Sequence, residues 1–205
     1  MRQRYRENYE RIAADHIAHW RATGQNPWQP DEQVRATNDS TAALVMRHSR
    51  PGDFVLDAGC GMGDLLSRVT GRHLHGCDMA RPYLEVARER GIEAVYGELE
   101  RMPYPADHFD VVTATDVLEH VIDLNAVVAE LLRVLRPGGV LIVRVPSNED
   151  LAPYLDPRYP YFFVHLRRFD DAGLRLLFTR VFECEVVESS PSWNGVEVNM
   201  VVRKP

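Results

Sequence analysis

The chain has 205 residues, of which 45% are hydrophobic and 26% charged, with a formal net charge of −6 and a pI of about 5.7. This length suits one compact domain with a sizeable core. The acidic balance disfavours a broad nucleic-acid-binding face, which needs clustered basic residues, and no apolar run reaches the length of a membrane span.

Three widely spaced cysteines, Cys60, Cys77 and Cys184, form no CxxC motif. They argue against a disulfide framework or a structural zinc site, and we interpret them as buried thiols in a reducing compartment. The first segment, MRQRYRENYERIAADH, has no apolar stretch, so we expect no signal peptide and a cytoplasmic location.

The chain begins with two predicted helices. Apolar and aromatic residues recur at helical spacing over residues 2–21, and Gly24, Pro27 and Pro30 then break the pattern. Residues 31–48 are predicted to form the second helix. We interpret residues 1–50 as a helical cap, placed before the core at residues 51–205.

From residue 54 onward, short apolar runs alternate with helical segments. Strands are predicted at residues 54–58, 73–77, 92–96, 109–114 and 140–145, and helices at residues 63–70, 82–90, 124–135 and 170–180. This alternation predicts an α/β fold with a doubly wound, Rossmann-like parallel sheet.

The last two predicted strands, residues 183–188 and 195–202, are joined only by SSPSWNG. This connection is too short for a crossover helix, so the two strands should form an antiparallel hairpin at the sheet edge. We therefore predict one domain over residues 1–205. Its seven-stranded sheet is mostly parallel with an antiparallel C-terminal edge strand.

The segment VLDAGCGMGDLL predicts a strand that turns at glycines before a helix, and such a loop alone is a weak signal of ligand binding. Asp78 follows the next predicted strand, where an acidic residue accepts hydrogen bonds from a ribose diol. Both features lie at the carboxyl ends of adjacent strands, the usual ligand edge of an open α/β sheet. A nucleoside or a dinucleotide fits this arrangement.

Asp57 distinguishes these two ligands. The glycines follow the spacing GxGxG rather than GxGxxG, and a carboxylate beside them would repel a pyrophosphate. An ammonium or sulfonium group would instead be attracted, by about 1 kcal/mol at about 4 Å in water and several times more in a partly closed cleft. We predict a cationic nucleoside without phosphates, and S-adenosylmethionine is the obvious candidate.

Four segments in order resemble the motifs of class I S-adenosylmethionine-dependent methyltransferases, in particular the type 11-like and ubiquinone-type group. They are VLDAGCGMGD, CDMA, YGELERMPYPADHFDVVTATDVLEHV and LLRVLRPGGVLIVRVPS, and together they extend over residues 54–147. The resemblance implies that Asp57, Gly59 and Gly61 hold the methionine end of the cofactor. It assigns Cys60 at most a backbone contact, with no role for its thiol.

The remaining cofactor contacts are also implied by the resemblance. Asp78 would bind the ribose hydroxyls, and Met79 would pack on the adenine. Glu98 and Leu99 would meet the adenine edge, although Glu98 stands where the family commonly has Asp. The alternative for Glu98, which we favour less, is a solvated loop acid. Thr115 would lie beside the methionine moiety.

The segment TDVLEHV places Asp116, Glu119 and His120 after the fourth strand, near the cofactor's methyl group. We favour a bracing role for Glu119 and His120 at the next helix. Alternatively His120 acts as a general base, since imidazole titrates near neutrality. A third hypothesis is a magnesium-like ion, because a similar E-x-x-E-H pattern holds one in ubiquinone-type O-methyltransferases. Asp116 departs from that pattern, and we predict no metal.

An aromatic segment follows the fifth strand, and residues 146–169 are interpreted either as an acceptor lid or as a helix-packing insert. His165 is our first candidate for a base or an acceptor-orienting residue. Arg158, Arg167 and Arg168 are candidates to pair with an acidic group of the acceptor.

The N-terminal region carries Tyr5, Tyr9, Trp20 and Trp28, which we expect either to cover the cleft or simply to pack on outer helices. The predicted function is methyl transfer from S-adenosylmethionine to a small-molecule acceptor, at an O, N or C atom that the sequence leaves open. We expect no nucleic-acid or membrane partner, and the oligomeric state is not readable. Two alternatives are a non-catalytic S-adenosylmethionine-binding protein and a nicotinamide-dependent oxidoreductase, although the GxGxG spacing argues against the second.

Overall fold

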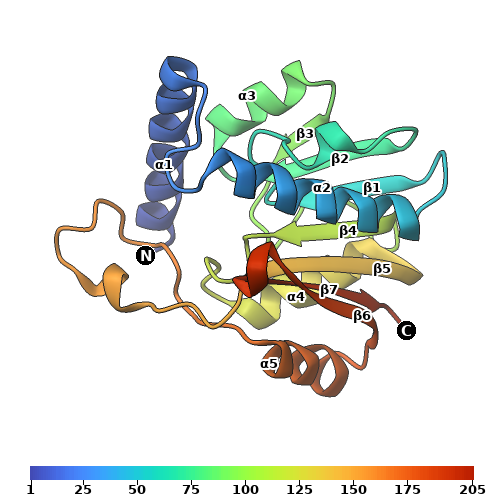
Figure 1. Ribbon diagram of the computed structural model, residues 1–205. Helices are drawn as coiled ribbons and strands as arrows, with labels where there is room; N and C mark the ends of the chain where they lie inside the picture. The colour runs from blue at the N-terminus through green and yellow to red at the C-terminus, as the bar shows by residue number, and fades with distance from the viewer.

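A computed structural model describes residues 1–205, and a seven-stranded sheet forms its centre (Figure 1). The strand order is β3-β2-β1-β4-β5-β7-β6. Strands β1 to β5 pair in parallel, whereas β7 runs antiparallel to both β5 and β6. The strands are β1 (Phe54–Ala58), β2 (His73–Asp78), β3 (Glu93–Tyr96), β4 (Phe109–Thr115), β5 (Leu135–Pro146), β6 (Glu185–Ser192) and β7 (Glu197–Arg203).

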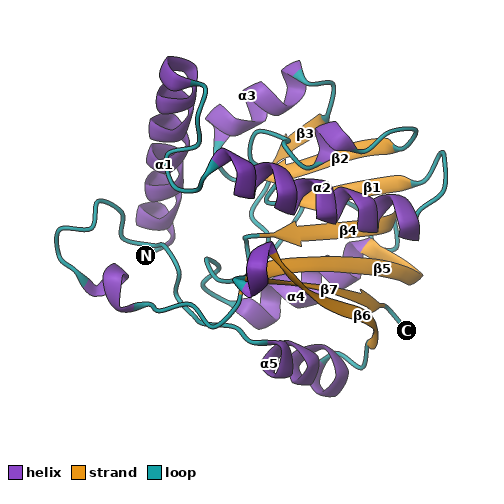
Figure 2. Cartoon of the chain, in the orientation of Figure 1, coloured by secondary structure: helices purple, strands orange, loops and turns teal.

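Helices cover both faces of the sheet (Figure 2). Helices α2 (Asp31–His48) and α3 (Arg81–Glu89) pack on one face, and α4 (Leu124–Val134) and α5 (Asp171–Leu176) pack on the other. Neighbouring residues on a strand point to opposite faces of the sheet. Val55 therefore packs in the apolar cluster beneath α2 and α3, and Leu56 packs in the cluster beneath α4 and α5. Both strand faces are therefore apolar, as expected of a buried parallel sheet.

Helix α1 (Arg2–Thr23) lies outside these two layers. It packs against α3 and stands beside the segment that connects β5 to α5 (Figure 1). The hydroxyl of Tyr83 on α3 lies 2.8 Å from His16 Nδ1, and Asn8 bonds the backbone of Phe162 and Phe163. This helix thus joins two parts of the chain that lie on opposite sides of the ligand edge.

The predicted seven-stranded, mostly parallel sheet and its C-terminal antiparallel hairpin are confirmed. Within the hairpin, β7 lies inside and β6 forms the sheet edge. The helix predicted at residues 63–70 is wrong, since only a 3-10 turn forms at Leu66–Arg68. Gly63 has φ +80°, outside the helical region, and Gly71 at φ +68° ends the segment two residues before β2.

The three cysteines are free and buried, as predicted. Burial raises the pKa of each thiol, with that of Cys77 near 12. None of the helices combines the length and the apolar character that a membrane crossing requires.

Candidate functional site

A cavity of about 1000 Å³ lies at the carboxyl ends of β1, β2, β4 and β5. The loops that follow these strands line it, together with α1, the start of α2, and residues of the connection between β5 and α5. This is the edge at which open α/β sheets bind ligands, because parallel strands deliver all their following loops to one side.

The three loop glycines have different roles. A Cβ on Gly59, at φ +84°, would overlap Val117, and one on Gly63 would overlap Ile92, so both are required by backbone conformation and packing. A Cβ on Gly61 would meet no atom within 4 Å, and Gly61 lines the cavity. The bare face of Gly61 therefore leaves room for a ligand to approach the backbone.

Two carboxylates flank this loop. Asp57 is 2% exposed and accepts a 2.6 Å hydrogen bond from the Thr113 hydroxyl, and burial raises its pKa to about 6. Asp78 accepts hydrogen bonds from the backbone N–H groups of Gly61 at 2.9 Å and Ala80 at 2.8 Å. These bonds fix the Asp78 carboxylate at the cavity wall beside the bare face of Gly61.

Met79, Leu99 and Thr115 line the same cavity, where the sequence placed them. Cys60 also lines it, but its side chain is 5% exposed and faces Gly76, where an added Cβ would lie 2.6 Å from Sγ. The thiol thus packs against β2 at Gly76, where a side chain would leave it no room.

Glu98 is placed differently from the expectation. It does not line the cavity, and its carboxylate pairs with Arg6 on α1. Glu100, two residues further along, lines the cavity. The turn after β3 therefore presents a different acid to the site than the family pattern implied.

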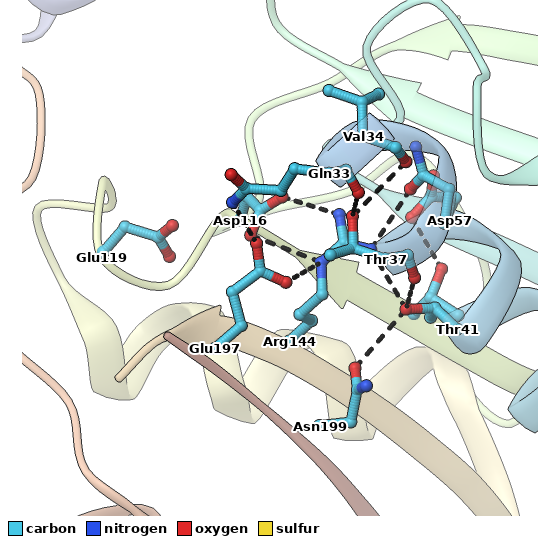
Figure 3. Close-up of polar contacts among 12 residues, drawn as sticks. Gln33, Val34, Thr37, Thr41, Asp57, Asp116, Glu119, Arg144, Glu197 and Asn199 are labelled. Atoms are coloured by element: carbon cyan, nitrogen blue, oxygen red, sulfur yellow. Dashed lines mark hydrogen bonds and ion pairs between the residues drawn. The ribbon is translucent and has the colours of Figure 1, made fainter. Parts of the chain in front are cut away.

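Asp116 also lines the cavity, in the left-handed region at φ +54°. Its carboxylate pairs at 2.7 Å with Arg144, which is 4% exposed (Figure 3). Arg144 also donates to Asn38 at 3.2 Å and Thr41 at 3.1 Å, and lies 3.6 Å from Glu197. The sequence analysis missed Arg144, although a single arginine inside the apolar run VLIVRVP was a visible signal.

Glu119, His120 and His165 form a cluster that lines the same cavity, and their candidate metal-binding atoms lie within 4.8 Å of one another. Glu119 is 1% exposed, and burial beside Asp116 raises its pKa well above its usual value. Burial and the neighbouring His165 lower the pKa of His120 to about 3. His120 is therefore neutral and a weak proton acceptor at physiological pH, contrary to the expectation that it titrates near neutrality.

His165 is held by two neighbours from its own segment. Its Nδ1 contacts the carboxylate of Glu149, which also accepts a 2.8 Å hydrogen bond from the Tyr154 hydroxyl. A carboxylate on one imidazole nitrogen fixes the orientation of the ring. Asp116 lies outside the candidate metal-binding set, and its carboxylate is paired with Arg144.

The three arginines predicted to meet the acceptor do not line the cavity. Arg158 pairs with Asp156, Arg168 donates to Asn148, and Arg167 donates to backbone carbonyl groups that follow β4. None of the 40 lining residues is lysine or arginine. Eight are acidic: Asp57, Asp64, Asp78, Glu100, Asp116, Glu119, Glu149 and Glu197.

Aromatic residues of the N-terminal region reach the cavity as well. Tyr5, Tyr9 and Trp28 line it, whereas Trp20 packs in a small apolar cluster beside α3. The Tyr5 hydroxyl donates to the carbonyl of His120 at 3.3 Å, so α1 contacts the loop after β4 directly.

Residues 56–143 match a protein family described as "Methyltransferase domain". The match runs from β1 into β5 and includes the glycine loop, Asp78 and the Glu119–His120 pair. This region is a class I S-adenosylmethionine-dependent methyltransferase domain.

Relatives of this methyltransferase domain differ in their named substrates. A malonyl-[acyl-carrier protein] O-methyltransferase of Serratia marcescens is 40% identical over 48% of this chain and 40% of its own length. A ubiquinone biosynthesis O-methyltransferase of Marinobacter nauticus is 32% identical over 66% and 63%. A probable tRNA methyltransferase 9B of Homo sapiens is 33% identical over 51% and 24%. The chain therefore spans less than two thirds of each of these relatives.

Solved methyltransferase structures share the fold over the whole chain. The magnesium protoporphyrin IX methyltransferase of Synechocystis with bound SAH has a TM-score of 0.76 at 17% identity, with all of both chains covered. A chain from the complex with the Haloferax volcanii Trm112 methyltransferase activator has a TM-score of 0.75 at 19% identity, covering 96% of this chain and 97% of its own. At these identities the likeness concerns the fold alone.

Proposed function

We propose that this protein transfers the methyl group of S-adenosylmethionine to a small-molecule acceptor. One observation supports this most directly: a single cavity is lined both by the glycine loop with Asp57 and Asp78 and by the Glu119–His120–His165 cluster. A cofactor and an acceptor can therefore meet in one cavity.

The residues around the glycine loop fit the cofactor. When bound, S-adenosylmethionine supplies an electrophilic methyl group on a positively charged sulfur. Asp57 would attract that cation, and Asp78, aligned by two backbone N–H groups, would bind the ribose hydroxyls. Met79 and Leu99 would provide an apolar surface for the adenine. Glu98 is a poorer candidate for the adenine edge, because its carboxylate already pairs with Arg6.

The chain would act mainly by alignment. Methyl displacement at a sulfonium needs the acceptor atom in line with the methyl group and the sulfur, and positioning alone supplies much of the acceleration. His165, oriented by Glu149, is the best-placed imidazole to accept a proton. Asp116 would position the loop after β4 through Arg144 rather than exchange protons itself.

We further propose that residues 146–169 form a lid over the acceptor and that residues 1–50 form a cap on the same core. The support is the contact between them: Asn8 on α1 accepts from the N–H of Phe162 at 3.0 Å and donates to the carbonyl of Phe163 at 3.2 Å. The two elements would exclude water from the methyl group as one unit.

A small molecule fits better than the tRNA that the name of one relative suggests. Phosphate backbones are bound by lysine and arginine, and the cavity is lined by neither. The net charge of −6 points in the same direction.

The test follows methyl-labelled S-adenosylmethionine in a host cell extract, with an Asp57→Ala variant alongside. A Glu185→Ala variant serves as the control, because Glu185 is 65% exposed and pairs with Arg203 outside the cavity lining. Label in a small molecule with the wild type and the control, but not with Asp57→Ala, supports the proposal. Label in RNA or protein would refute the acceptor class. Cofactor binding without any labelled product would instead favour a binding protein.

A further inference from the structure

Buried polar atoms without hydrogen-bond partners concentrate on the acceptor side of the cavity. Of the seven such atoms, Glu197 Oε2 lies 3.6 Å from Arg144, Asp110 Oδ1 pairs with Arg136, and His75 Nε2 lies outside the cavity. The other four are both carboxylate oxygens of Glu119, the hydroxyl of Tyr9 and Nδ1 of His120, and these three residues line the cavity. Buried polar groups in folded proteins are nearly always paired, because an unpaired one carries its full desolvation cost. These atoms therefore indicate a ligand that completes the site.

The chemistry of that ligand follows from Glu119. A carboxylate only accepts hydrogen bonds, so its partner must be a donor. Figure 3 shows Glu119 apart from the Arg144 network, with no interaction drawn to it. The charged groups around it are the carboxylates of Asp116 and Glu149 and the guanidinium groups of Arg144 and Arg167. Neither arginine pairs with Glu119, because Arg144 pairs with Asp116 and Arg167 donates to backbone carbonyl groups. This surrounding is short of positive charge, which favours a cation.

Aromatic rings complete the same region. The Tyr9 ring lies edge-to-face with His120 at 6.0 Å between centroids, and Tyr154 lies 5.0 Å from His165 and 5.2 Å from Tyr159. Aromatic faces attract ammonium groups and gain nothing from carboxylates or phosphates. A negatively charged acceptor would find no lysine or arginine among the lining residues.

We propose that the acceptor is an amine, bound as its ammonium form by the carboxylate of Glu119 among the rings of Tyr9, Tyr154 and Tyr159. This inference rests on the proposed methyl transfer and specifies its acceptor atom as nitrogen.

The reaction then balances without a further reactant. The ammonium group gives one proton to Glu119, which leaves a neutral amine with a free electron pair. That pair forms the new N–CH₃ bond as the S–CH₃ bond of the cofactor breaks, and the sulfur keeps the bonding electrons. The product leaves as a methylammonium ion, and Glu119 releases its proton to water. Burial raises the pKa of Glu119, and an ammonium group bound beside it offsets this effect because it stabilises the ionised carboxylate.

The first test compares three probes with one skeleton: tyramine, the alcohol tyrosol and 4-hydroxyphenylacetate. Their binding is measured calorimetrically with S-adenosylhomocysteine present at saturation. Tyramine should bind at least tenfold more tightly than tyrosol, and the carboxylate should not bind. Glu119→Gln should reduce tyramine to the affinity of tyrosol, whereas Glu185→Gln should change nothing. Equal affinities for amine and alcohol, no binding of the amine, or an unaffected Glu119→Gln would each overturn the proposal.

Two further readouts separate this proposal from the alternatives. S-adenosylhomocysteine binding is measured first: its absence would refute the proposed function, whereas its retention in Glu119→Gln shows a folded variant.

Tyramine also carries a phenol, so mass spectrometry of the methylated product distinguishes N-methylation, as expected, from O-methylation, which would refute the amine site. Tyramine binding that is unchanged by EDTA is expected. Binding restored only by added Mn²⁺ would show a metal ion held by Glu119, His120 and His165 instead.

Discussion

Replacing Gly59 or Gly61 with alanine should separate folding from ligand binding within one loop. At Gly59 the new Cβ overlaps Val117, and φ is +84°. The left-handed backbone costs about 1–2 kcal/mol for a residue with a side chain, and overpacking about 1–3 kcal/mol. We expect Gly59→Ala to lose about 2–5 kcal/mol of unfolding free energy, which lowers Tm by about 2–4 °C per kcal/mol for a chain of this size.

At Gly61 only the first cost applies, because φ is +50° and no atom lies within 4 Å of the new Cβ. Gly61→Ala should therefore lose about 1–2 kcal/mol of stability. Its Cβ projects into the space proposed for the cofactor, so S-adenosylhomocysteine affinity should fall at least about tenfold, or about 1.4 kcal/mol. Urea unfolding and calorimetric binding measure the two effects. Equal stability losses, or unchanged affinity in Gly61→Ala, would refute the division of roles.

Three further perturbations test other parts of the site. The pKa of Asp57 is about 6 and its ionised form attracts the cofactor, so S-adenosylmethionine affinity should rise with pH up to about 6, by at most about tenfold per pH unit, and then level off. Calorimetric titrations at a series of pH values measure this, and the affinity of Asp57→Asn should not change with pH. Arg144→Met should cost about 3–5 kcal/mol in urea unfolding, since Glu197 is left buried without a counter-charge, and a loss below about 1 kcal/mol would contradict the buried network. Asn8→Leu removes the bonds to residues 162 and 163, so it should raise the acceptor KM several-fold while cofactor affinity stays unchanged; a parallel loss of cofactor affinity would argue against a lid role.

Much of the fold could be predicted because local pattern and tertiary packing agree. The apolar runs of β1, β4 and β5 are buried on both faces, so hydrophobicity alone locates them. The failure at residues 63–70 has a physical reason. Apolar residues recur there at helical spacing, but Gly63 adopts a positive φ, which the spacing of apolar residues does not encode.

The residues that the sequence assigned to the cofactor follow strands at fixed positions in a familiar order, and all but Glu98 line one cavity. His120 and His165 were also named from the sequence, but their proximity to each other and to α1 was not predictable, because α1, the loop after β4 and the connection after β5 are far apart in sequence. Arg144 was missed for the same reason: its partners Asn38, Asp116 and Glu197 come from three separate elements. Which side chain pairs with which depends on tertiary contacts that no single-segment pattern contains.

The three buried cysteines have a practical consequence. Thiolates, not thiols, react with maleimides, and burial with a raised pKa keeps these thiols protonated and inaccessible. A cysteine introduced at Leu155, which is 83% exposed, would then be the reactive position of the native chain. A fluorophore attached there would report, without prior removal of native cysteines, how residues 146–169 respond when each ligand arrives.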